Sequence, residues 1–142
     1  MAFTGNFTCN TFKTGLMNGS FNFTSGSFYL ALYTNTASLD ATTTAYTSTG
    51  EATGGNYSPG GSLLTVSQVP TTGNQTGAAT SYISFSNASW TGAITARGAL
   101  IYKIGAGGAV CVLDFGADKT STNTFTVQFP AVTNTSAIIR IS

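Results

Sequence analysis

The chain has 142 residues, enough for one ordinary domain with a single hydrophobic core. It has five Lys or Arg, four Asp or Glu and no histidine, which gives a formal net charge of +1. So few ionisable groups exclude strong electrostatic attraction to nucleic acid, and they leave little for proton transfer, imidazole metal sites or phosphate binding. We therefore expect no enzymatic activity, no cofactor and no nucleic-acid partner.

The N-terminal part of the chain predicts a short helix between Thr8 and Gly19. Phe12 and Leu16 lie four residues apart, which places them on one face of a helix. The dipeptide at 18–19, Asn-Gly, is a typical signal for the end of a helix. We expect Thr8 or Asn10 to lie near the N-terminal cap.

One compact domain is expected, made of an N-terminal arm at 1–19 and an antiparallel β domain at 20–142. Residues 1–15 lack the basic and apolar regions of a secretory signal, so we expect synthesis in the cytosol. The longest apolar runs, such as 109–113, are too short to span a bilayer, so no membrane partner is expected.

The remaining pattern is that of short β-strands. Apolar and polar residues alternate in three stretches, which predicts half-buried strands at 81–86, 124–129 and 137–141. Two stretches are apolar on both faces, which predicts strands covered on both sides, at 28–33 and 110–115. Further strands are expected at 63–69, at 94–104 and, from a weaker pattern, at 44–52. Strands at this spacing favour a single antiparallel β-sandwich or barrel-like domain.

The glycine-rich turn at 105–108 allows one strand register to be predicted. If it closes a symmetric hairpin, Ala99 lies opposite Asp114. Arg97 is then the diagonal neighbour of Asp114 on the same face, within reach of its long side chain. We therefore predict a structural ion pair between Arg97 and Asp114.

Other candidate chemistry has simpler explanations. The stretch 105–110 lacks the third glycine of a dinucleotide-binding loop and leads into a strand, so a hairpin turn is expected. Asp114 and Asp118 are close in sequence, but no histidine is available to support an acid–base pair. Cys9 and Cys111 are expected to be free thiols, since one pair gives no disulfide framework. No metal site is expected, although a single Ca²⁺ bound by Asp oxygens stays open.

Trp90 has two interpretations. It follows the residues at 87–89 in an expected loop or strand edge. Its ring either packs in the core or, with nearby tyrosines, offers a platform on which a sugar stacks.

Five stretches of the chain together suggest a family: 30–34 (LALYT), 37–46 (ASLDATTTAY), 94–102 (ITARGALIY), 112–121 (VLDFGADKTS) and 137–141 (AIIRI). They resemble small virion proteins of short-tailed bacteriophages of marine bacteria, including cyanophages. The resemblance covers most of the chain after about Phe12 and implies location in the virion. The role it implies is capsid decoration, as a knob or cement protein bound to the major capsid protein or other virion proteins. It assigns no role to individual residues.

For such a protein, the aromatic-rich N-terminus is our candidate surface for docking on the capsid. The candidate residues are Phe3, Phe7, Phe12, Leu16 and Met17. The alternative is that this segment only covers the sandwich. A tail or fibre module that binds host glycans through Trp90, and a tail or neck connector, stay open as other functions. Few charges are available to protect the edge strands, so self-association is a further expectation.

Overall fold

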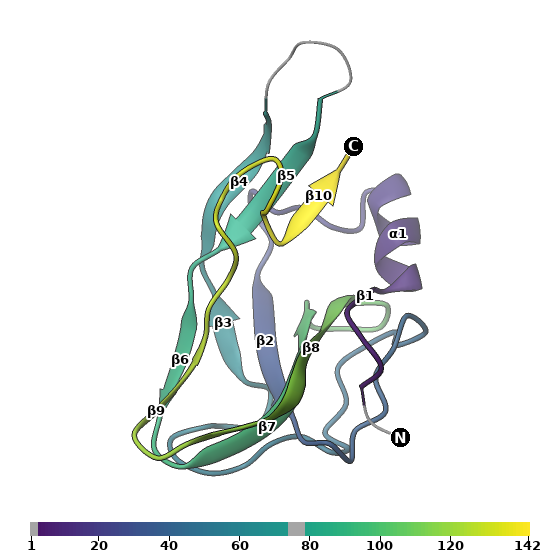
Figure 1. Ribbon diagram of the computed structural model, residues 1–142. Coiled ribbons are helices and arrows are strands. Elements are labelled where there is room, and N and C mark those ends of the chain that lie inside the picture. The colour runs from purple at the N-terminus through teal and green to yellow at the C-terminus, as the bar shows by residue number, and fades with distance from the viewer. Residues whose placement is uncertain (1–2, 74–78) are drawn as a thin grey trace.

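The computed structural model describes residues 3–73 and 79–142 and consists mainly of antiparallel β-strands (Figure 1). Its elements are β1 (Phe7–Thr8), α1 (Asn10–Met17), β2 (Phe28–Tyr33), β3 (Ser62–Leu64), β4 (Val66–Thr72), β5 (Ser81–Phe85), β6 (Ala88–Thr91), β7 (Ile94–Tyr102), β8 (Ala109–Ser121), β9 (Thr124–Val127) and β10 (Ile139–Ile141). The strands form a five-stranded sheet in the order β1-β8-β7-β2-β3, a three-stranded sheet β10-β5-β4 and a two-stranded sheet β6-β9. The predicted mainly β, sandwich-like domain with one short N-terminal helix is confirmed.

The strand predictions are mostly correct, with three differences. The predicted strand at 44–52 is wrong, because this segment is an irregular connection with one isolated bridge, from Glu51 to Tyr33. The strand expected at 63–69 is two strands, β3 and β4, which Thr65 separates and which belong to different sheets. The sequence pattern did not predict β6 as a strand, although Trp90 lies in it.

The middle of the large sheet is buried on both faces, as the sequence predicts for β2 and β8. Every residue of β2 except Tyr29 is buried. One face meets the three-stranded sheet, where the rings of Phe28 and Phe85 lie 6.1 Å apart. The other face is covered by the connection between β2 and β3, in which Tyr46 stacks on Tyr102 at 5.0 Å. The core is therefore two apolar layers that share one sheet.

The N-terminal segment belongs to this packing. β1 pairs with β8, so that Thr8 lies opposite Cys111. The helix α1 starts after Cys9, whose side chain makes no capping hydrogen bond but whose backbone N–H donates to the carbonyl of Val110 at 2.9 Å. Thr8 and Asn10 therefore flank the N-terminal cap, as expected, and the pairing with β8 fixes where the helix begins.

The end of α1 agrees with the sequence pattern. Asn18 is the C-terminal cap, and Gly19 follows with a φ of 77°, in the left-handed region that favours glycine. Gly15 lies inside the helix against the ring of Phe21, and a Cβ atom at this position would lie 2.3 Å from that ring. The close return of the chain after the helix therefore requires a residue without a side chain at position 15.

We predict that Gly15→Ala destabilises the protein. Alanine normally favours an exposed helix by about 1 kcal/mol relative to glycine. Here we expect the free energy of unfolding to fall by about 1–3 kcal/mol, because the added methyl group must displace Phe21. Urea denaturation measures this. The control is Thr14→Ala, at an exposed site of the same helix, with an expected change within about 0.5 kcal/mol. An increase in stability for Gly15→Ala would contradict the prediction.

Candidate functional site

The predicted docking residues fall into a buried and an accessible group. Phe3 is 5% exposed and packs on Gly98, where an added Cβ would lie 2.5 Å from its ring. Phe12 is also buried, whereas Leu16 is half-buried and Met17 is 84% exposed. Phe3 and Phe12 therefore cover the sandwich, which is the alternative that the sequence left open. Of the three α1 residues among these candidates, Leu16 and Met17 stay accessible to a partner.

A trough runs between α1 and β10, where these accessible residues lie. Two neighbouring cavities of about 660 and 400 Å³ occupy it. Four apolar side chains line both cavities, and this defines the α1–β10 trough: Phe12, Leu16, Ile139 and Ile141. A third cavity, of about 300 Å³, continues the larger one past β1, where Phe7 lies. Cavities of this size accommodate side chains or a short peptide segment.

Each of the two elements that form this trough ends in an exposed apolar residue. Met17 is the last residue of α1 and Ile141 is the last residue of β10, and they are 84% and 55% exposed. Single exposed apolar residues are ordinary on protein surfaces. Here, however, Ile141 lines both cavities and Met17 directly follows Leu16, which also lines both.

Positive charge collects around the same trough. Lys13 and Arg140 line the larger cavity. Lys103 lies 4.9 Å from the ring centre of Phe21, which lines the smaller one. Three of the five cations of the chain are therefore here, while no Asp or Glu is among the described residues that line the three cavities. The negative charge of Asp40 helps to raise the pKa of the Cys9 thiol, just before the start of α1, but Asp40 does not line the trough.

The predicted ion pair is confirmed and lies between β7 and β8. The Nε of Arg97 donates to Oδ1 of Asp114 at 2.9 Å, and this hydrogen bond lowers the pKa of the Asp114 carboxyl below its ordinary value. The predicted register is wrong by one residue, since Asp114 lies opposite Gly98 rather than Ala99. Next to the turn, Tyr102 lies opposite Ala109, two residues from the Cys111 that the predicted hairpin places there, and the extra residue of β8 at the bulge before Tyr102 reduces this difference to one. The pair is structural, as expected.

Trp90 is a core residue. It is 5% exposed, lies opposite Phe125 across the β6–β9 pair, and its ring centre is 5.5 Å from that of Tyr57. No face of the indole is therefore available to a sugar. The interpretation of Trp90 as a glycan-stacking residue is wrong.

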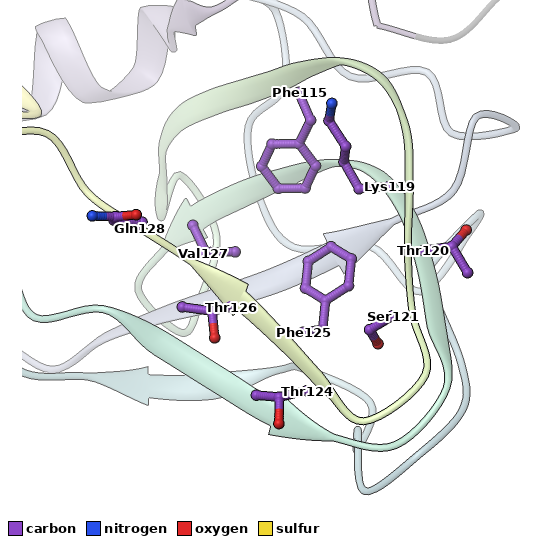
Figure 2. A pocket seen from close by; sticks show the side chains of 9 residues that line it. All are labelled: Phe115, Lys119, Thr120, Ser121, Thr124, Phe125, Thr126, Val127 and Gln128. Atoms are coloured by element: carbon purple, nitrogen blue, oxygen red, sulfur yellow. The ribbon is translucent and has the colours of Figure 1, made fainter.

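A separate cavity of about 450 Å³ lies where β8 arches over β9, and Figure 2 shows its lining. The rings of Phe115 and Phe125 lie 6.2 Å apart in it, with Lys119 at the rim. The hydroxyls of Thr120 and Thr126 already share hydrogen bonds of 2.9 and 2.8 Å with Thr or Ser of a paired strand. None of the described residues that line this cavity is acidic, so it offers no acid–base pair.

Glu51 is held by tyrosines on the outer face of the large sheet. Its carboxylate accepts hydrogen bonds from the hydroxyls of Tyr46 at 2.5 Å and Tyr57 at 2.6 Å, and from the backbone N–H of Gly60 at 2.7 Å. The hydroxyl of Tyr102 donates to the carbonyl of Gly60 at 2.7 Å. These bonds fasten the connection between β2 and β3 onto the sheet.

The same cluster keeps its phenols protonated. Burial, with the Glu51 carboxylate as a further cause, raises the pKa of Tyr46 and of Tyr102 to about 12. Burial and the hydrogen bond to Glu51 raise the pKa of Tyr57 further still. A phenol with such a pKa donates hydrogen bonds at neutral pH and does not act as a base. The hydrogen bonds of this cluster therefore hold the connection between β2 and β3 on the sheet.

Within residues 3–73 and 79–142, no three His, Cys, Asp or Glu side chains gather to form a metal site. No helix in this part of the chain has the length and apolar character needed to cross a membrane. Cys9 and Cys111 are buried free thiols. Cys111 lies opposite Thr8 in the β1–β8 pairing, and Cys9 follows Thr8 as the N-terminal cap of α1.

Comparison of the chain with known protein families, with curated proteins and with solved structures finds no match.

We predict that Glu51→Gln lowers the free energy of unfolding by about 1–3 kcal/mol. The amide nitrogen of glutamine cannot accept a hydrogen bond, so at least one of the three donors around position 51 loses its acceptor. Chemical denaturation measures the change. The matched control is Asp118→Asn, at an exposed carboxylate that accepts a bond from Asn35, with an expected change within about 0.5 kcal/mol. Equal effects of the two variants would contradict the role of Glu51.

We predict a stability that is flat from about pH 5 to pH 8, because the chain has no histidine. Hydrogen bonds lower the pKa of Asp40 and Asp114 below 3.8, so their contribution is lost as the pH falls below that value. Burial raises the pKa of Cys9 from 9.0 to about 11 and that of Tyr46 from 10.0 to about 12. Stability therefore falls as the pH rises above about 9. Denaturation midpoints from pH 3 to pH 11 check the plateau, and a midpoint that changes between pH 5.5 and pH 7.5 would contradict it.

Proposed function

We propose that this chain is a non-enzymatic structural protein of a bacteriophage particle. It decorates or cements the outer surface of the capsid and docks there through the α1–β10 trough and its rim. Its partner is the major capsid protein or another virion protein. The observation that carries this proposal is the trough between α1 and β10, with the exposed Ile141 in its lining and the exposed Met17 next in sequence to Leu16, which also lines it. The resemblance of the chain to virion proteins of short-tailed marine phages supports the location.

The surface chemistry fits a contact that must hold in sea water. At that ionic strength the screening length is only a few Å, so charges separated by more than this contribute little to binding. Burial of apolar side chains does not weaken with salt in this way. Full burial of one large apolar side chain contributes about 1.5–3 kcal/mol, so Met17 and Ile141 together supply a useful part of a docking energy.

The test uses point variants rather than deletion of residues 1–19. Deletion removes β1 and the buried Phe12, so loss of the truncated protein from particles would only report misfolding. Met17 and Ile141 are exposed, and their replacement leaves the core intact. Thermal melting of each purified variant shows that the fold is kept.

We predict that the double variant Met17→Asp, Ile141→Asp is incorporated into particles at least about ten-fold less than the wild type, since 1.4 kcal/mol corresponds to a factor of ten. Quantitative mass spectrometry of purified particles gives the copy number. The matched control is Leu63→Asp on β3, a 58% exposed apolar residue at the opposite end of the large sheet from β1. Normal incorporation of the double variant would contradict docking through the trough.

A tail or fibre module that binds glycans has less support, because the aromatic residue that suggested it is buried. Absence of the wild-type chain from the capsid, with labelled chain on the tail or neck in particle images, would favour the connector function instead.

A further inference from the structure

We infer that the α1–β10 trough binds an extended, acidic segment of a virion partner, which adds as a strand to the free edge of β10. This inference rests on the proposed function and names the chemistry of the partner. Three independent features carry it: an unpaired strand edge, an apolar cavity beside that edge, and two cations that form no ion pair within the described residues.

The unpaired edge is that of β10. This strand pairs with β5 along one side only, and its other side faces α1 across the trough (Figure 1). An extended peptide binds such an edge through main-chain hydrogen bonds. The opposite edge of the same sheet is protected differently, because β4 carries two irregularities in its pairing and Pro70, which has no N–H to donate. β10 has neither a pairing irregularity nor a proline, and its three residues include the charged Arg140.

The walls of the trough suit a strand with alternating side chains. The 400 Å³ cavity is lined mainly by apolar side chains, among them Phe12, Phe21 and Ile83. The 660 Å³ cavity also has polar and charged residues in its lining, among them Lys13 and Arg140. Successive side chains of an added strand point to opposite faces. Apolar residues at alternate positions of the partner would therefore enter the apolar 400 Å³ cavity.

The charges select an acidic partner. Lys13 and Arg140 line the larger cavity, and within the described residues neither forms an ion pair. One N–H of the Arg140 guanidinium donates to the carbonyl of Thr135, so four of its five donors stay available. A carboxylate placed between these cations makes charge-assisted hydrogen bonds at contact distance, where salt screening is weakest.

The experiment measures binding of the full chain to capsids assembled without it, by co-sedimentation at 0.15 and 0.5 M NaCl. We expect the double variant Lys13→Gln, Arg140→Gln to raise Kd at least about ten-fold at the lower salt concentration, and to reduce the salt dependence. The matched control is Lys119→Gln, which changes a cation of the separate cavity under β8 and is expected to leave Kd unchanged. An unchanged Kd for the double variant would overturn the inference and leave the proposed function standing.

Two further measurements separate strand addition from other modes of docking. Hydrogen exchange of the capsid-bound chain should be slowed at least about ten-fold at the β10 amides and unchanged at β3, the edge strand at the far end of the large sheet. A photo-crosslinking residue in place of Met17 should attach to an extended capsid segment that contains Asp or Glu. Crosslinks to a helix, to a segment without acidic residues or to a second copy of this chain would overturn the inference. If the wild type does not bind capsids at all, the proposed function fails and this inference falls with it.

Discussion

The strand β2, the second half of β7 and the first part of β8 are apolar on both faces, and most of the remaining chain serves to keep both faces out of water. A single second sheet cannot do this, since it covers one face only. The second cover is irregular. It consists of the connection between β2 and β3 and of the N-terminal segment, which places Phe3 on Gly98. Irregular covers have no ladder of backbone hydrogen bonds, so individual side chains must fasten them.

This need explains where the few acidic groups are used. Glu51 gathers the hydroxyls of Tyr46 and Tyr57 and the N–H of Gly60, and so fastens the irregular cover to the sheet. Asp114 pairs with Arg97 at the bulged part of the β7–β8 hairpin, where the regular ladder is interrupted. A hydrogen bond to a charged group is stronger than one between neutral groups, so it can stabilise places where few backbone hydrogen bonds form. Half of the acidic residues of this chain thus replace missing backbone pairing.

The sequence predicted the strands because alternation and two-sided apolar runs reflect burial directly, as in β2. It also predicted the Arg97–Asp114 pair, since a long side chain tolerates an error of one residue in register. It could not predict that 44–52 is irregular, because its conformation is fixed by contacts such as Tyr46 with Tyr102, far away in sequence. Only the α1 side of the trough could be predicted, through Leu16 and Met17. The β10 side could not, because β10 is far from α1 in sequence and only the fold brings the two together.

The fold shows where the few positive charges of this chain lie. The cations are not spread evenly over the surface, since Lys13, Lys103 and Arg140 lie around one trough. The carboxylates of Glu51 and Asp114 form their hydrogen bonds in other parts of the fold. In strong salt such an arrangement cannot attract a partner from a distance. It acts only once the surfaces touch, by favouring partners that bring an acidic group into an otherwise apolar contact. The charges therefore contribute to the choice of partner, and the apolar walls contribute most of the binding energy.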